Sequence, residues 1–300
     1  TGLNASTLYH FAVYEYNGAG TTANYYTNAG YATGNRWTLG PEPATGLAAF
    51  DAYQVSTTSI SNTWLLGSTI LVDFGRHDGN VNGDVTASPD YNGNYWNNIG
   101  PTTQSVTNGT KIVNMVNVLN GATAASIEMT TAGWQCNGIL NGGHTNPSAS
   151  LLGILAITNA TKDYFFVDQT QASFKIAGLN TASTYRLTFF GSRDSTSTRV
   201  TRYTVGTNSV ELTTSGTGIG SGGVNYNNNT TAILSALSPN SSGEISVTMT
   251  NATGQFGYIS MLKIEEMTAV SGFLILRQPY AVPTNRPSDG VVYTNGQYLG

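Results

Sequence analysis

Apolar and polar residues alternate with a period of two in many short runs of this chain, and helical periodicity is nearly absent. The runs are rich in Val, Ile, Thr, Tyr and Phe, and turns of Gly, Asn, Ser and Pro separate them, which is typical of β-sandwiches and jelly rolls. The pattern therefore predicts an all-β fold. The expected strands are 9–16, 56–65, 69–74, 111–118, 124–130, 163–167, 172–176, 184–191, 199–205, 209–213, 231–237, 244–250, 257–264 and 272–277.

One local pattern occurs twice with the same spacing. Gly2-Leu3-Asn4 precedes Tyr9, and Gly178-Leu179-Asn180 precedes Tyr185, with the Tyr six residues after the Leu in both copies. In sandwich domains, a Tyr at such a corner buries its ring and returns its hydroxyl to the backbone just upstream. The repetition predicts two separate sandwiches.

Three segments resemble parts of the fibronectin type III repeats of large bacterial, Bacteroidetes-like surface proteins. TGLNASTLYHFAVYEYNGAGTTANYYT (1–27) resembles their last two strands, and PEPATGLAAFDAYQVSTTSISNTW (41–64) resembles their first two. SGFLILRQPYAVPTNRPSDGVVYTNGQYLG (271–300) resembles the next strand and the loop after it. The resemblance implies that residues 1–40 are the final strands of one such domain, and that 41–66 plus 268–300 form a second, partial and discontinuous one.

The segment between them resembles the galactose-binding-like or malectin-like jelly rolls of secreted carbohydrate-active proteins. The resemblance implies that residues 67–267 are an inserted jelly roll, so that fibronectin-like sandwich segments at both ends flank a larger β-sandwich. It also implies carbohydrate binding. The motifs that carry it are ILVDFG (70–75), YNGNYWNNI (91–99), FKIAGLNTASTYRLTFFGSR (174–193), RVTRYTV (199–205) and FGYISMLKIEE (256–266).

Composition narrows the partners and the compartment. Only 9% of residues are charged, the net charge is −4, and 10% are aromatic, so the chain is expected to fold. The 12 Lys and Arg residues form no basic stripe, so nucleic acid is not an expected partner, and no apolar run is long enough to predict a membrane span. Cys136 is the only cysteine, which excludes an intrachain disulfide and predicts a small buried hydrophobe. A Thr-, Asn- and Gly-rich, Lys-poor β-protein is typical of bacterial surface proteins, which predicts an extracellular location.

The segment 78–84 resembles the start of a calcium loop of the EF-hand type. Side-chain oxygens stand at every second position, on Asp78, Asn80, Asn82 and Asp84, with Gly83 at the sixth position. However, the twelfth position is Pro89 rather than Glu. Two interpretations remain open: a bound Ca²⁺, or a turn built from Asn, Asp and Gly.

A second group of side chains suits carbohydrate binding, because flat apolar rings stack on sugars and a few polar groups orient them. The alternative is that Trp96 anchors its loop beneath the sandwich. The candidates for stacking are Tyr91, Tyr95, Trp96, Trp134 and Tyr226, and those for polar contacts are Asn97, Asn98, Asp73 and Arg193.

No catalytic apparatus is predicted. The histidines lack the spacing of a zinc site, and no G-x-S-x-G motif occurs. A carboxylate pair for glycoside hydrolysis can be recognised only in three dimensions. Hydrolysis therefore stays a third hypothesis, which would depend on His144 or Asp73.

Two other functional hypotheses follow. Final strands at 1–27 and opening strands at 41–64 and 271–300 predict sandwich edges that neighbouring repeats, or another copy of the chain, complete by β-strand addition. A head-to-tail contact of that kind builds a filament. The leading hypothesis is a non-enzymatic extracellular structural or adhesive repeat protein, a subunit of a surface filament or stalk with a carbohydrate-binding-like domain. The alternative is the carbohydrate-binding region of a secreted polysaccharide-degrading enzyme.

Overall fold

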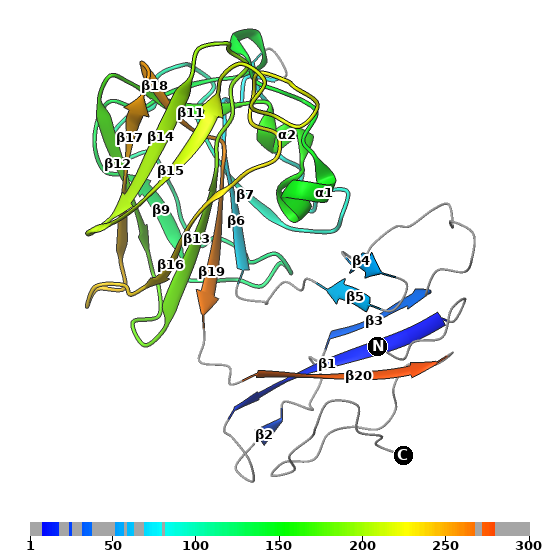
Figure 1. Cartoon of the computed structure of the whole chain (residues 1–300). Coiled ribbons are helices and arrows are strands. Elements are labelled where there is room, and N and C mark those ends of the chain that lie inside the picture. The colour runs from blue at the N-terminus through cyan, green and yellow to red at the C-terminus, as the bar shows by residue number, and fades with distance from the viewer. Residues whose placement is uncertain are drawn as a thin grey trace. The chain divides into compact units, whose positions relative to one another are not determined.

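The chain divides into two compact units in a computed structural model (Figure 1). One unit contains Thr1–Trp64 and Thr268–Gly300, and the other contains Leu65–Met267. The structure describes residues 69–79 and 82–267 in full, and it describes the backbone of the strands within 8–17, 24–25, 32–37, 52–56, 59–62 and 272–279. The fold is all-β, as the alternating pattern predicts.

The larger unit contains a sheet of six strands, a sheet of five and a smaller sheet of three (Figure 1). Neighbouring strands are antiparallel except β6 and β7, which are parallel. The six-stranded sheet has the order β15 (Asn208–Ser215), β14 (Arg199–Val205), β17 (Ile245–Thr253), β12 (Gln171–Ala177), β9 (Ser126–Met129) and β8 (Lys111–Ile112). The five-stranded sheet has the order β16 (Ala232–Leu237), β13 (Thr184–Phe190), β19 (Met261–Met267), β6 (Thr69–Phe74) and β7 (Trp96–Ile99). The three-stranded sheet has the order β10 (Gln135–Asn137), β11 (Tyr164–Asp168) and β18 (Phe256–Ile259).

The main core lies between the two large sheets. Strand β12 buries every second residue, so that Phe174 points inward and packs against Phe74 of β6, with ring centroids 5.6 Å apart. Phe189 of β13 stacks on Tyr203 of β14 with centroids 4.3 Å apart. Each such side chain contributes about 1.5–3 kcal/mol through burial. Aromatic contacts therefore join the two sheets into a sandwich.

Strand β6 departs from simple alternation, because all six of its residues are buried. Ile70, Val72 and Phe74 belong to the main core, whereas Leu71 belongs to a second cluster on the opposite face of the sheet. Residues Leu152, Leu155 and Ala160 of a short helical segment complete that cluster. The segment contains η2 (Ile139–Asn141), α1 (Ala149–Leu152), η3 (Gly153–Leu155) and α2 (Thr158–Thr161). β6 is thus covered on both faces, which is why its residues are buried without alternation.

The predicted tyrosine corner is present in this unit. The Tyr185 side chain is buried, and the backbone N–H of Asn180 donates a 2.8 Å hydrogen bond to its hydroxyl. Tyr185 thereby fixes the entry into β13. The matching side chain of Tyr9 lies outside the described residues.

Two expected strands differ most from the observed ones, and several others differ by one to three residues at an end. The predicted strand 257–264 is two strands, β18 and β19, because Ser260 exchanges backbone hydrogen bonds with Phe190 and Phe74 and the chain passes there from the three-stranded to the five-stranded sheet. The predicted strand 111–118 stops after Ile112, because Asn114 has a φ of 54°, in the left-handed region that a strand excludes.

In the smaller unit, strand β1 (Leu8–Asn17) pairs with β20 (Gly272–Pro279) along one edge and with β3 (Ala32–Trp37) along the other. It also pairs with β2 (Asn24–Tyr25), and β4 (Ala52–Ser56) pairs with β5 (Ser59–Asn62). The resemblance to fibronectin repeats places 1–40 and 268–300 in different domains, whereas β1 and β20 share one sheet. The backbone groups of β1 find partners within their own chain on both sides.

Within the described part of the chain, no helix has the length and apolar character needed to cross a membrane.

Candidate functional site

The three-stranded sheet has an aromatic cluster on one face. Along β11, Phe165 and Val167 enter the main core, and the alternating residues Tyr164 and Phe166 point to the other face. Phe256 and Tyr258 of β18 join them there. Phe166 lies opposite Tyr258 in the strand register, and the ring centroids of Tyr164 and Tyr258 are 5.0 Å apart. The cluster forms a rigid aromatic base on this face.

Two arginines meet at the hydroxyl of Tyr258. Arg193 lies between β13 and β14, and its Nη1 donates to that hydroxyl at 3.3 Å. Arg199, the first residue of β14, donates to the same oxygen through its own Nη1. The Arg199 guanidinium also lies over the Phe256 ring, 4.7 Å from its centroid, in a cation–π contact. We refer to Arg193, Arg199, Phe256 and Tyr258 as the arginine–aromatic site.

The site presents positive charge at the surface. Arg193, Arg199 and Phe256 are half-buried, while Tyr258 is fully buried behind them. Burial raises the pKa of Tyr258, although the charges and hydrogen bonds of both arginines oppose that effect. The tyrosine is therefore a neutral hydroxyl at physiological pH, and it cancels neither guanidinium charge.

A loop beside this site holds a second pair of stacked rings. The carbonyl of Gly142 accepts a 2.7 Å hydrogen bond from the backbone N–H of Asp194, and a Cβ at Gly142 would lie 3.0 Å from Nε of Arg193. Two residues further on, the buried His144 stacks on the half-buried Tyr226, with centroids 4.7 Å apart and planes 12° apart. Burial lowers the pKa of His144 to about 4, so the imidazole is neutral. Two predicted binding residues, Arg193 and Tyr226, thus border the same loop.

Other predicted carbohydrate contacts lie inside the core. Trp96 is 3% exposed, and its indole N–H donates to Oδ2 of Asp90 at 2.9 Å. Trp134 is equally buried, with its indole N–H directed to the carbonyl of Ser173. Asn97 is buried, and its Nδ2 donates to two backbone carbonyls. The prediction that these side chains meet a sugar is wrong, because none presents a face to solvent; Trp96 anchors its loop, as the alternative holds.

Tyr91 and Tyr95 lie in the loop that leads into β7. Tyr91 is 74% exposed, and its hydroxyl donates to the carbonyl of Ala156 beside η3. Tyr95 is half-buried. The exposed Tyr91 ring lies against the helical segment and is not part of the arginine–aromatic site.

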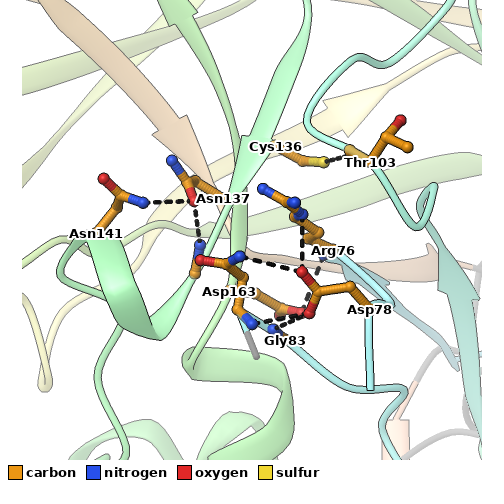
Figure 2. Close-up of polar contacts among 10 residues, drawn as sticks. Arg76, Asp78, Gly83, Thr103, Cys136, Asn137, Asn141 and Asp163 are labelled. Carbon is orange, nitrogen blue, oxygen red and sulfur yellow. Dashed lines mark hydrogen bonds and ion pairs between the residues drawn. The ribbon is translucent and has the colours of Figure 1, made fainter. Parts of the chain in front are cut away.

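The predicted calcium loop is organised by hydrogen bonds to Asp78 (Figure 2). Its Oδ1 accepts from the backbone N–H groups of Asn82 and Gly83, and its Oδ2 accepts from Nδ2 of Asn82 and forms an ion pair with Arg76. Partial burial opposes ionisation of Asp78, but these hydrogen bonds and the Arg76 charge outweigh it and lower its pKa. Both oxygens already serve N–H donors, which is the arrangement of a turn. Among the described residues, no group of three His, Cys, Asp or Glu side chains could hold a metal ion. Asn80 lies outside those residues, so calcium binding at 78–84 stays a prediction.

Two buried carboxylates lie next to this turn. Oδ2 of Asp73 accepts from the backbone N–H of Thr86 at 3.3 Å, and Oδ2 of Asp163 accepts from that of Arg76 at 3.0 Å. The Oδ1 atom of each is buried and has no hydrogen-bond partner in the described part of the chain. Burial raises the pKa of Asp73 to about 7, and burial together with the charge of Asp73 raises that of Asp163 well above its usual range.

The chain packs tightly around the Asp163 carboxylate. A Cβ at Gly75 or at Gly83 would clash with its oxygens, so both positions need glycine. Asp73 and Asp163 are each 0% exposed. The two acids are therefore enclosed by protein and meet no solvent.

The signal for the arginine–aromatic site was present in the sequence only in part. Arg193 belongs to the predicted set, whereas Arg199, Phe256 and Tyr258 do not. They lie in RVTRYTV and FGYISMLKIEE, two segments that alternate like any other strand. Only the pairing of β18 with β11 and the position of β14 bring these residues together.

A scan against protein-family models finds no match, and a search of curated proteins finds none either. Among solved structures, part of the chain is similar to a ruminal GH26 endo-beta-1,4-mannanase, with 14% identity and a TM-score of 0.23. The similarity covers 44% of this chain and 26% of the mannanase chain. A TM-score this low does not establish a shared fold.

Proposed function

We propose that this chain is a non-enzymatic, extracellular structural or adhesive protein of a bacterial surface, and that residues 65–267 form its carbohydrate-binding module. The observation that carries the proposal is the arginine–aromatic site. Half-buried guanidinium groups on a rigid aromatic base offer oriented hydrogen-bond donors at the surface, which is how polar groups fix a sugar in binding sites.

The state of the acidic residues supports binding rather than hydrolysis. A glycosidase needs two carboxyl groups that flank the scissile bond. Asp73 and Asp163 are both enclosed, and His144 is 4% exposed and stacked under Tyr226. The residues on which the hydrolysis hypothesis depends therefore do not reach a polysaccharide in this structure.

The pairing of β1 bears on how copies of the chain would associate. In the filament hypothesis, the first strands of one copy, within residues 1–27, complete the open sandwich of the next copy. In this structure β1 pairs with β20 and β3 of its own chain. We therefore propose adhesion through a bound glycan, and assembly by β-strand addition stays a separate prediction.

A glycan array probed with the whole 300-residue chain tests the proposal. We expect binding to a subset of polysaccharides that is lost in the double variant Arg193→Gln/Arg199→Gln and kept in Trp134→Phe, which changes a buried side chain far from the surface. The same preparation should release no reducing sugar from any bound glycan. Binding to no glycan, or turnover of one, would contradict the proposal.

A further inference from the structure

The charge around the arginine–aromatic site is unbalanced. The chain has few Lys and Arg residues, and five of those in the described part form ion pairs with Asp or Glu. The ion pairs within 4.0 Å involve Arg76, Lys162, Lys175, Arg202 and Lys263. Arg193 and Arg199 form none in that part of the chain, although both reach one hydroxyl. Like charges held this close repel each other unless an anion lies between them.

The nearby carboxylate of Asp194 does not neutralise the positive charge of the two arginines. The negative charge of Asp194 acts on Arg193, but its carboxylate is exposed and is not among the ion pairs of the described residues. Tyr258 stays neutral because burial raises its pKa. The site therefore keeps a net positive charge in a protein whose net charge is −4.

The two guanidinium groups are positioned as a fork for an anion. Arginine carries five N–H donors in a fixed plane, and here one Nη of each is used by Tyr258. Phe256 supports one face of Arg199, which leaves the N–H edge for a ligand. Nε of Arg193 is buried next to Gly142, so the donors that Arg193 has left for a ligand are on its Nη groups. Paired N–H donors of this kind bind planar or tetrahedral oxyanions in bidentate fashion.

We propose that the arginine–aromatic site binds the anionic group of an acidic glycan, a carboxylate of a uronic acid or a sulfate ester. This inference rests on the proposed function, which supplies the glycan, and it adds that the glycan carries a negative charge. A nucleic acid backbone is a poorer fit, because it needs a track of cations along many phosphates, whereas this acidic protein offers two arginines at one point. A single anionic substituent on an otherwise neutral chain suits such a site.

Affinity electrophoresis and calorimetry of the whole chain test the inference with four polymers. Polygalacturonate is compared with its carboxyl-reduced form, and dextran sulfate is compared with dextran, so the carboxylate and the sulfate are distinguished. We expect one anionic polymer to bind at least about 10-fold more tightly than its neutral counterpart, which corresponds to about 1.4 kcal/mol. Arg199→Gln should remove that preference, and added salt should weaken it.

Arg202→Gln is the matched control. Arg202 lies on the same strand, β14, but is 48% exposed and paired with Glu211. Its replacement removes the same charge and should leave the preference unchanged. Arg199→Lys keeps the charge without the fork and should bind at least several-fold more weakly than the wild type; melting temperatures identify any variant that has lost its fold.

The outcomes separate the two proposals. Binding to neutral glycans without a preference for either anion overturns this inference and leaves the proposed function standing. An equal loss in Arg199→Gln and Arg202→Gln also overturns it, because the attraction would then be non-specific. Binding to none of these polymers and to no glycan on an array overturns the proposed function itself.

Discussion

The buried acid Asp73 makes the stability of this protein depend on pH in a direction opposite to that of most carboxylates. Its pKa rises from 3.8 in an exposed state to about 7 in the folded protein, chiefly through burial. The folded state therefore binds a proton that the unfolded state has released. Stability from this group is fully present below pH 4 and is lost as the pH rises toward 7. At about 1.4 kcal/mol for each pKa unit, the loss amounts to about 4 kcal/mol.

Asp73→Asn isolates this effect. An amide resembles the protonated acid: its oxygen can accept from the N–H of Thr86, and its NH₂ occupies the position of the Oδ1 atom that lacks a partner. We expect the variant to match the wild type near pH 4 and to gain on it by about 4 kcal/mol by pH 7.5. Most other titrations occur in both proteins and cancel in the difference. That of Asp163 does not cancel fully, because the charge of Asp73 contributes to its raised pKa.

The measurement is urea denaturation at a series of pH values, followed by fluorescence, to which the buried Trp96 and Trp134 of the same unit contribute. Asp168→Asn is the control, because it makes the same substitution at an exposed position outside the core. If the wild type and Asp73→Asn have parallel pH profiles, the folded protein does not hold Asp73 protonated and the reasoning fails.

Three further predictions concern single features of the larger unit. Tyr185→Phe removes the hydroxyl that accepts from Asn180 and should lower the free energy of unfolding by about 1 kcal/mol in chemical denaturation; an unchanged value would mean that the corner adds nothing. Trp96→Ala should cost about 3–5 kcal/mol through the cavity it leaves, while sparing glycan binding at equal fold, and a selective loss of binding would return Trp96 to the binding site. Calcium or EDTA should leave the melting temperature unchanged, because Asp78 already serves N–H donors; a rise with calcium would show that 78–84 binds the ion after all.

The fold class could be predicted from the sequence because alternating apolar and polar residues are typical of β-strands. A period of two places side chains on opposite faces of a strand, and this predicted the bounds of β14 and the class as a whole. The tyrosine corner was readable for a similar reason, since Gly178, Leu179 and Tyr185 are local and their spacing sets the geometry. The helical segment over β6 was not, because its helices are only four residues long and carry no clear periodicity.

The candidate site depends on contacts between segments that are far apart in the sequence. The sequence does not distinguish exposed aromatic residues from buried ones. Trp96 and Trp134 were therefore predicted as binding residues, although both are buried. The acids Asp73 and Asp163 are 90 residues apart and become a pair only when β6 and the start of β11 meet. Their raised pKa values come from desolvation, which is a property of the surroundings.

The sequence by itself determined the all-β class, the positions of most strands, the corner at Tyr185 and the place of Arg193 among candidate binding residues. Only the tertiary structure decided that Arg199 and Tyr258 complete that site, since they are 59 residues apart and on different sheets. The alternating pattern predicts the face of the strand to which each side chain points. Whether that face then meets a second sheet, a helical segment or solvent depends on segments far away in the chain, and burial and charge balance follow from that choice.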